Sequence, residues 1–209
     1  MTVPGSTQSR RGRTGDLRRL LLSNTLALLR DRNSVEFSLR ELADRIGVTQ
    51  PALYRHFASK DALLEALCIE GFDLLARQQR AAMQQAGSDA WKRLTALSRA
   101  YIRFATKHPD YFRVMFELGV ANAPHVTPQV LPTFHLLVDA VVDCQRGGSI
   151  APGNSRDIAI GVWSSVHGLA SLLLNGPLGD VLTRNPMRAK RLEKTVLSIL
   201  SEGLKRTRR

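Results

Sequence analysis

The 209-residue sequence predicts an all-α protein with an N-terminal three-helix bundle followed by a larger helical domain. Apolar residues recur at helical spacing from residue 16 onward, and no segment alternates in the way expected of a half-buried strand. Loops rich in proline and glycine separate these periodic segments. Hydrophobic residues make up 44% of the chain, which is typical of a globular protein with a sizeable core.

The first 14 residues, MTVPGSTQSRRGRT, are predicted to form a flexible basic arm. Proline, glycine and serine oppose helix formation there, and Arg10, Arg11 and Arg13 form a cluster of positive charge. Such an arm is able to reach phosphates beside a main binding site. The alternative interpretation is a solvated tail without a function.

A first helix is predicted over residues 16–32, within a domain that spans residues 15–62. Its apolar stripe is formed by Leu17, Leu20, Leu21, Thr25, Leu28 and Leu29. Asn33 and Ser34 are expected to end this helix.

Residues 38–60 have the pattern of two short helices joined by a tight turn. Ser38 and Glu41 match the capping box that starts a helix, and Gly47 supplies a left-handed residue that ends it. Thr49 is suited to cap the second helix, whose first turn contains a proline. This arrangement is the helix-turn-helix motif, whose second helix enters the major groove of DNA.

The same segment resembles the DNA-binding domain of the TetR family of transcriptional regulators. The resemblance runs without a gap through FSLRELA (37–43), GVT (47–49), ALYRHF (52–57) and SKDALL (59–64). Residues 31–37 lack the glycine usual in that family, and Asn33 is able to adopt the left-handed conformation instead. The resemblance implies a DNA-binding regulator, with repression as the usual mode, whose first helix packs across the motif.

The residues expected to contact double-stranded DNA lie on or beside the two motif helices. The predicted set is Arg40, Thr49, Gln50, Pro51, Ala52, Tyr54, Arg55, His56 and Lys60. Within this set, base edges are assigned to Arg40, Gln50 and Arg55. Phosphates are assigned to Thr49, Tyr54, His56 and Lys60.

The distribution of charge agrees with a polyanionic partner. The net charge is +12 at pH 7, and the pI is near 10.8. Residues 1–60 contain 11 Lys and Arg against 5 Asp and Glu, whereas residues 61–209 contain 19 against 13. Each part therefore carries +6, so the charge per residue is more than twice as high in the part that contains the motif.

A long helix is predicted from residue 59 to about residue 85, and the larger domain, residues 63–209, starts within it. No linker rich in proline or glycine occurs between residues 60 and 86. We therefore expect one rigid element to join the two domains.

The rest of the chain is also predicted to be helical. The expected helices cover residues 89–107, 110–118, 128–146, 155–175 and 185–205. The dipeptide His108-Pro109 separates the first two of these helices, and loops are expected at 119–127 and 147–153. The basic residues 205–209 are expected to fray.

The segment 155–175 has almost no polar face, which indicates a helix buried on both sides. A monomer of this size offers no obvious second layer, so one side is expected to face a second copy of the chain. With the final helix it would form a four-helix homodimer interface, as the family resemblance also implies. The predicted interface residues are Val162, Leu169, Leu172, Leu192, Val196, Ile199 and Leu200.

Trp163, His167 and Gly168 resemble the Trp-x-x-x-His-Gly pattern of one TetR subgroup, and this resemblance implies a pocket for an unidentified small-molecule effector. The aromatic composition suits a small apolar or aromatic ligand, with an orienting hydrogen bond from His167 or Tyr101. The alternative is a packed core with a hydrogen-bonded histidine. The predicted ligand-binding residues are Tyr101, Phe104, Phe112, Met115, Phe116, Phe134, Trp163 and His167.

Other chemistry is not expected. Cys68 and Cys144 lack metal-ligand spacing, so buried thiols are favoured over a redox switch, and no metal or cofactor is predicted. No His-carboxylate or Ser-His spacing lies on a glycine-rich or strand-turn framework, so no catalytic residue is assigned and an enzyme is not expected. The N-terminus has no apolar run, which favours a cytoplasmic protein without a membrane partner.

These patterns predict a sequence-specific transcriptional regulator, a repressor released from a palindromic operator by a small apolar or aromatic ligand. The alternative is a helical protein-interaction module whose helix-turn-helix is only structural. The polar and cationic set Thr49, Tyr54, Arg55 and Lys60 argues against that alternative.

Overall fold

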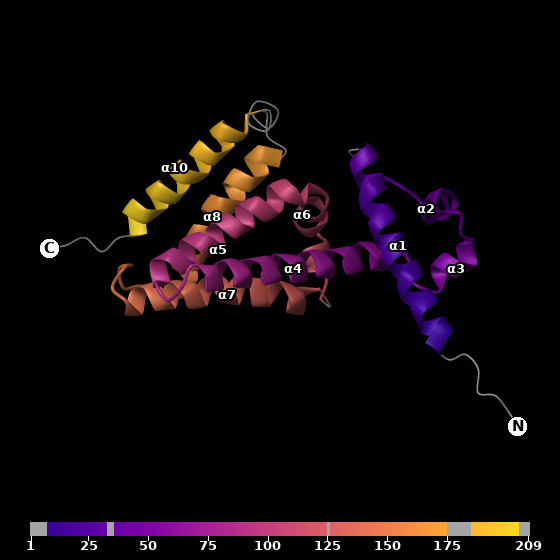
Figure 1. Cartoon of the computed structure of the whole chain (residues 1–209), viewed down its shortest axis with the longest axis horizontal. Helices are drawn as coiled ribbons and strands as arrows, with labels where there is room; N and C mark the ends of the chain where they lie inside the picture. Colours follow the sequence, from indigo (N-terminus) through magenta and orange to yellow (C-terminus); the bar gives the residue numbers. More distant parts are fainter. Residues whose placement is uncertain (1–7, 33–35, 125, 175–184, 205–209) are drawn as a thin grey trace, which may run out of the picture.

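The computed structural model describes residues 8–32, 36–124, 126–174 and 185–204, and these contain helices and no strand (Figure 1). The predicted all-α class is therefore confirmed. Three helices form a small unit at one end of an elongated molecule: α1 (Gln8–Arg32), α2 (Leu39–Ile46) and α3 (Gln50–Tyr54). The remaining helices form a larger bundle at the other end, so the two-part organisation is as the sequence predicts.

Helix α1 begins at Gln8, well before the predicted start near residue 16. Residues 8–14, predicted to belong to a flexible arm, are therefore helical. The strongest helix breaker, Pro4, lies before this segment, and the arginines within it are good helix formers. The remainder of the predicted arm, residues 1–7, lies outside the described residues, as do Asn33 and Ser34.

The caps that define the motif form as the sequence predicts. The Ser38 hydroxyl accepts a hydrogen bond from the Glu41 amide, and Gly47 ends α2 with φ of 75°. The Thr49 hydroxyl accepts from the Ala52 amide at the start of α3. These caps fix the turn between α2 and α3, because they satisfy backbone groups that neither helix can pair internally.

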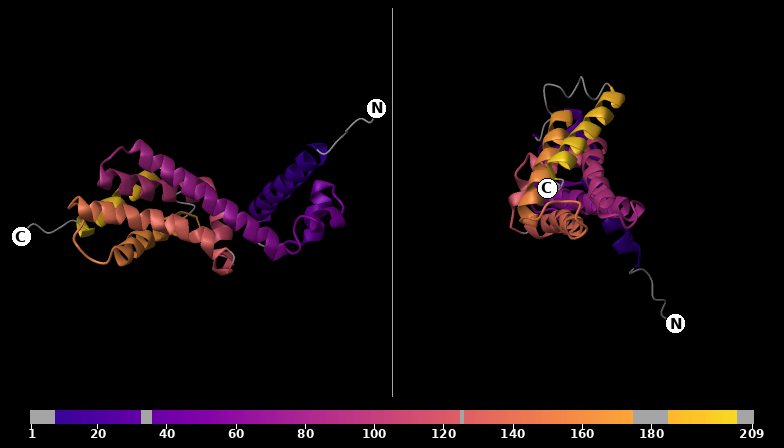
Figure 2. Two further views of the ribbon diagram at one scale, coloured as in Figure 1. Left: turned by 90° about the horizontal axis from the view of Figure 1, so that it is seen from below. Right: turned by 90° about the vertical axis from the view of Figure 1, so that its left-hand side faces the viewer.

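Helix α4 (Lys60–Gln85) connects the small unit to the bundle without a break (Figure 2). Ser59 caps it through the Ala62 amide, at the predicted start. Leu63 and Leu67 are buried against the small unit, and Phe72 is buried farther along in the bundle. One continuous cluster of buried residues contains all three, so the core itself extends across the two parts of the molecule.

The larger bundle follows the predicted order of helices. It contains α5 (Ala90–Lys107), α6 (Pro109–Phe116), the short 3-10 turn η1 (Val120–Asn122), α7 (Thr127–Arg146), α8 (Ser155–Leu174) and α10 (Pro186–Leu204). Pro109 occupies the first turn of α6, where its missing N–H leaves no bond unmade. The predicted end of α8 at residue 175 and the tail 205–209 fall outside the described residues.

Helix α8 packs against α5, α7 and α10, and only part of it faces away from the bundle. Val162 and Leu169 were predicted in a dimer interface, but both are buried inside the protomer, because the helix turns these positions toward its own core. Leu172 and Ile199 are exposed, and Leu192, Val196 and Leu200 are half-buried. Among the described residues α8 is long and apolar enough to cross a membrane, a property that core helices share.

Candidate DNA-contacting surface and ligand cavity

Most residues predicted to contact DNA are exposed on the small unit. Pro51 and the polar side chains of Arg40, Thr49, Gln50, Tyr54 and Arg55 are exposed, whereas Ala52, His56 and Lys60 are half-buried. The Thr49 hydroxyl accepts from the Ala52 amide at 3.4 Å, so its own proton stays available for a phosphate oxygen.

Aromatic and ionic contacts hold this surface in place. The Lys60 ammonium lies 4.5 Å from the centre of the Phe37 ring, and the Arg18 guanidinium lies 5.4 Å from the Phe57 ring. Arg45 pairs with Asp31 of α1 at 2.6 Å, so this cation of α2 serves to fix α2 on α1.

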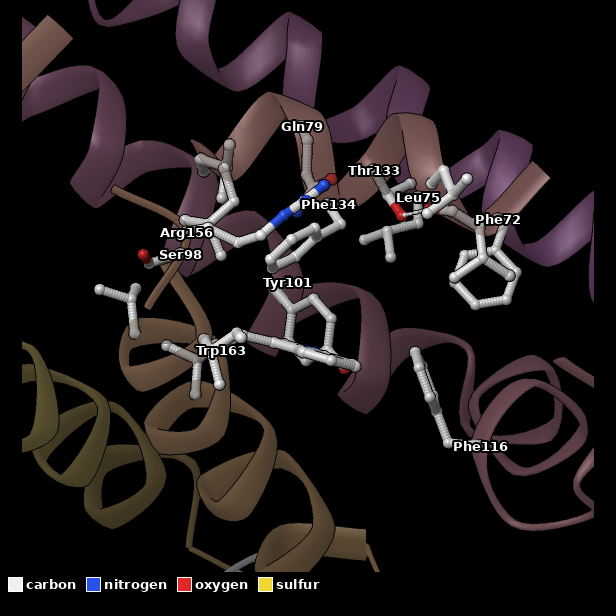
Figure 3. Close-up of a pocket in the computed structure, with 17 residues that line it drawn as sticks. Phe72, Leu75, Gln79, Ser98, Tyr101, Phe116, Thr133, Phe134, Arg156 and Trp163 are labelled. Atoms are coloured by element: carbon white, nitrogen blue, oxygen red, sulfur yellow. Dashed lines mark hydrogen bonds between the residues drawn. The ribbon is translucent and has the colours of Figure 1, made fainter. Parts of the chain in front are cut away.

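The larger bundle contains a cavity of about 480 Å³ bounded by α4, α5, α7 and α8, with one residue of α6 in its wall (Figure 3). Four of the predicted pocket residues line it, namely Tyr101, Phe116, Phe134 and Trp163. The wall also contains Phe72, Leu75, Gln79, Leu97, Ser98, Val130, Leu131, Thr133, Leu137, Arg156, Ile160, Val162 and Val166. Its size and its apolar lining are typical of a small-molecule site.

The other four predicted pocket residues do not line the cavity. Phe104, Phe112 and Met115 are fully buried in the core, where helical periodicity alone could not separate them from wall residues. His167 stands behind the wall, stacked on Phe112 at a centroid distance of 5.4 Å. This outcome combines the two interpretations of the aromatic cluster, because part of it is packed core and part of it faces a cavity.

Tyr101 binds both of the polar groups that the Trp-x-x-x-His pattern supplies. The Trp163 indole N–H donates to the Tyr101 hydroxyl at 3.2 Å, and that hydroxyl lies 2.7 Å from Nδ1 of His167. An indole is a donor only, so the tyrosine hydroxyl accepts from Trp163, and the direction of its bond with His167 is set by the tautomer of the imidazole. Burial lowers the pKa of His167, which favours the neutral imidazole, while the nearby Glu117 acts in the opposite direction.

Gln79 is one of the residues of the cavity wall that sequence reasoning missed. Its side chain is 3% exposed, and its Oε1 has no hydrogen-bond partner, the one buried side-chain nitrogen or oxygen without one in the described part of the chain. A buried acceptor left unpaired costs about 1–3 kcal/mol. The polar run RQQR around it suggests a solvated face, but position 79 continues the spacing of Phe72, Leu75 and Met83, which was the available signal.

The mouth of the cavity lies between α7 and α8. Leu131 and Ile160 are exposed apolar side chains there. The exposed Arg156 contributes a cation, and its guanidinium carbon lies 5.9 Å from the centre of the Phe134 ring. A ligand entering here would pass one solvated positive charge and then meet a mainly apolar interior.

Helix α6 connects the cavity to the small unit. Phe116, in its last turn, lies in the cavity wall, and Asp110, in its first turn, accepts a hydrogen bond from the Arg30 guanidinium of α1 at 2.9 Å. Helix α6 also packs closely on α4, where a Cβ added at Gly71 would lie 2.6 Å from the Met115 sulfur. A displacement of α6 therefore cannot occur without a response from α1 or α4.

Both cysteines are buried and free. Burial is the main cause that raises the pKa of Cys68 to about 12 and that of Cys144 to about 11, so neither forms a reactive thiolate near neutral pH. This supports buried thiols over a redox switch. The described residues contain no group of three or more His, Cys, Asp or Glu side chains that could hold a metal ion.

A helix-turn-helix unit joined by one continuous helix to a helical bundle with its own cavity defines a class of helical DNA-binding regulators. The chain belongs to the TetR family within that class. Residues 21–67 match the family described as bacterial regulatory proteins, tetR family, and residues 94–194 match the tetracyclin repressor-like C-terminal domain. The resemblance seen in the sequence is thereby confirmed for both parts of the chain.

Three relatives illustrate the match. The chain is 32% identical to the HTH-type transcriptional activator FasR of Mycolicibacterium smegmatis over 133 residues, which cover 63% of this chain and 60% of FasR. It is 48% identical to the class C tetracycline repressor of Escherichia coli over 50 residues, or 24% of this chain and 23% of the repressor. These matches span less than two thirds of either relative.

The third relative is a solved structure of a protein with unknown function from Rhodococcus sp. RHA1. It superimposes with a TM-score of 0.78 at 31% identity and covers 91% of this chain and 96% of that chain. The arrangement of the two parts is therefore shared across nearly the whole length of both chains.

Proposed function

We propose that this protein is a cytoplasmic, homodimeric transcriptional regulator that binds a palindromic operator and releases it when a small ligand fills the cavity. The observation that carries this proposal is the continuity of α4. Lys60 begins α4 shortly after the end of α3, the recognition helix expected to enter the major groove, and Phe72, Leu75 and Gln79, farther along, lie in the cavity wall. A single rigid element is thus shared by both sites.

The exposed cationic and polar side chains of α2 and α3 support the proposal of sequence-specific DNA binding. Arg40 and Gln50 have the donor groups that base edges accept in the major groove. The Thr49 hydroxyl and the Lys60 ammonium have the groups that hold phosphates and set the register on the duplex. The alternative of a purely structural motif leaves this exposed set without a role.

Dimerisation rests on the outer faces of α8 and α10. Leu172 and Ile199 are exposed there and offer apolar surface that a partner would cover. A Cβ at Gly161 or Gly168 of α8 would meet no atom within 4 Å, so the helix presents open space at these positions. Two such faces related by a twofold axis would give a close four-helix contact, and dimers of this kind suit paired half-sites.

Ligand release requires that ligand and operator prefer different arrangements of the protein. The contacts of α6 give a physical route, because Phe116 faces the cavity while Asp110 holds Arg30 of α1. A ligand that displaces Phe116 would shift α6 and, through α1 and α4, the spacing of the two recognition helices. A coupling of about 1–3 kcal/mol between the two sites is the typical magnitude.

Repression is the mode proposed here, and among the relatives the tetracycline repressor is named for it while FasR is named an activator. Whether the protein represses or activates transcription depends on where the operator lies relative to a promoter. A reporter gene placed under the selected operator measures the direction of regulation, because a repressor lowers expression of the reporter and an activator raises it.

The test of the proposed function is selection of binding sites from a random DNA duplex pool with the purified protein. The expected result is a palindrome whose half-sites are one helical turn apart, bound with a strong dependence on salt. Enrichment of no sequence, with binding that ignores salt, would instead support the protein-interaction module.

A further inference from the structure

We infer that the cavity takes an apolar aromatic molecule carrying one hydrogen-bond-donating hydroxyl group, and that Gln79 is the residue that recognises this hydroxyl. The inference rests on the proposed function in one respect, namely that the cavity is the effector site. It goes further by stating the ligand's chemistry and by assigning the recognition to a residue of α4.

The first step is that Gln79 offers an acceptor that nothing in the protein uses. Gln79 lies in the cavity wall, and its Oε1 is buried and lacks a partner. Buried polar groups in folded proteins are almost always paired, so an unpaired one on a residue of a cavity wall favours a partner supplied from outside, which a rotation of the terminal amide would bring within reach. The missing partner of a carbonyl oxygen is a donor, such as a hydroxyl.

The second step is that the hydroxyls of Tyr101 and Thr133 in the wall are already engaged. The Tyr101 hydroxyl accepts from Trp163 and is also hydrogen-bonded to Nδ1 of His167, so two protein groups already occupy it. The Thr133 hydroxyl donates to the backbone oxygen of Val130 at 2.6 Å. The orienting hydrogen bond expected from Tyr101 or His167 is therefore better assigned to Gln79.

The third step concerns charge. Arg156 is the charged residue in the cavity wall, and it is exposed at the mouth, beside the Phe134 ring. A solvated guanidinium is satisfied by water, so it does not require an anionic ligand. The desolvated amide of Gln79 has no such alternative, which favours a neutral hydroxyl over a carboxylate.

The arrangement of the wall gives the ligand a direction. In Figure 3, Phe72 and Phe116 lie together at one end of the cavity, and Gln79 lies away from them. Phe116 is in edge contact with Phe72 at a centroid distance of 5.5 Å. An aromatic body near these rings would leave its hydroxyl within reach of Gln79, whereas the reverse orientation would bury the hydroxyl against carbon.

The experiment uses three probes with one carbon skeleton: 4-phenylphenol, 4-methoxybiphenyl and biphenyl-4-carboxylate. The first donates a hydrogen bond, the second only accepts one, and the third is an anion. Affinity for the full-length protein without DNA is measured by calorimetry and by the fluorescence of Trp163. We expect 4-phenylphenol to bind about tenfold more tightly than the methyl ether, the gain typical of one buried hydrogen bond.

Gln79→Leu should reduce this preference to about twofold or less, because the acceptor is gone and the shape is nearly kept. The unliganded Gln79→Leu protein should also melt at a higher temperature than the parent, since the unpaired amide has been removed. Thr133→Val is the matched control, because it removes a polar group of the same wall that is already paired; it should keep the preference for the phenol.

The inference is overturned if the carboxylate binds best, if phenol and ether bind equally, if no probe binds, or if Gln79→Leu keeps the full preference. Operator titration with and without 4-phenylphenol is a separate measurement. Tight, Gln79-dependent binding of the phenol without any change in operator affinity would sustain this inference and contradict ligand release. Specific operator binding without binding of any probe would contradict this inference and would leave the proposed DNA-binding function standing.

Discussion

The Tyr101 hydroxyl lies 2.7 Å from Nδ1 of His167, and this contact joins a residue of the cavity wall to one that stands behind it. The same hydroxyl receives the Trp163 N–H, so three side chains from α5 and α8 form one hydrogen-bonded group. Its members hold the aromatic wall in one arrangement. Because these three side chains bond to one another, a polar group of the ligand would have to bind a different residue of the wall.

The first prediction concerns the stability of this group at different pH. Burial lowers the pKa of His167 below its ordinary value of 6.5 in the folded protein. Above pH 6.5 both states are neutral at this position. As pH falls below 6.5 the unfolded state takes up a proton that the folded state resists, so the free energy of unfolding falls. His108, whose pKa is lowered by burial and by Lys107, acts in the same direction.

We therefore expect the parent to lose stability between pH 7.5 and pH 5.5, and His167→Gln to lose less over the same interval. Urea denaturation at the two pH values measures both. His135→Gln, at an exposed position of α7, is the matched control and should follow the parent. An identical loss in the parent and in His167→Gln would show that the histidine titrates freely in the folded state.

The second prediction concerns the ion pair between Arg30 and Asp110. Arg30 is 66% exposed, so the pair is screened by solvent and should contribute at most about 1 kcal/mol to stability. Its position between α1 and α6 gives it a larger role in coupling. Asp110→Asn should leave the melting temperature nearly unchanged and weaken the effect of a bound ligand on operator affinity.

The measurement is operator titration with and without a probe that fills the cavity. Asp16→Asn breaks the pair of Asp16 with Arg19, which lies within α1 and is exposed on both sides, and it should leave the coupling as it is in the parent. If the two variants behave alike, α6 does not act on α1 through this pair.

Much of the fold could be predicted from the sequence because its signals are local. The caps at Ser38 and Thr49 form as expected, and Ser59 caps α4 at the start that was predicted for this helix. The start of α1 was missed because arginines sustain a helix there despite two glycines. Local signals thus predict where a helix lies, but they do not predict where it begins when no capping residue marks its start.

The site was less predictable because a wall residue and a core residue have the same composition. Phe112 and Phe116 are one helical turn apart on α6, yet Phe112 is fully buried and Phe116 faces the cavity. Val162 has the spacing of an interface residue and instead lies in the cavity wall. Only the tertiary arrangement separates these roles, and the same holds for Gln79, whose neighbours in sequence are polar.

The third prediction concerns assembly. Leu172 is 48% exposed on α8, and Leu172→Glu should break the homodimer because it places an unpaired charge in a dry contact. Gly168→Leu should do the same without harm to the protomer, since its added Cβ meets no atom within 4 Å. Leu20→Glu, at a similarly exposed leucine of α1, is the control.

Sedimentation equilibrium at micromolar concentration measures the result. The parent and Leu20→Glu should sediment at twice the chain mass of 23.2 kDa, and the two α8 variants should move toward the mass of one chain. A parent that sediments as a monomer, or an α8 variant that remains dimeric, would contradict the proposed interface.

The last prediction separates base contacts from phosphate contacts on the small unit. Lys60→Ala should weaken binding to all duplexes and lower the magnitude of the log–log salt slope by about one, because one phosphate contact is lost. Arg40→Ala should cost roughly 1–3 kcal/mol on the selected operator and relax preference at one base position. Arg103→Ala, at an exposed position of α5, is the control for net charge and should change neither quantity. Fluorescence anisotropy over a series of salt concentrations, with the operator and a scrambled duplex, measures all three. Equal losses for Arg40→Ala on both duplexes would move that arginine from the base edges to the backbone.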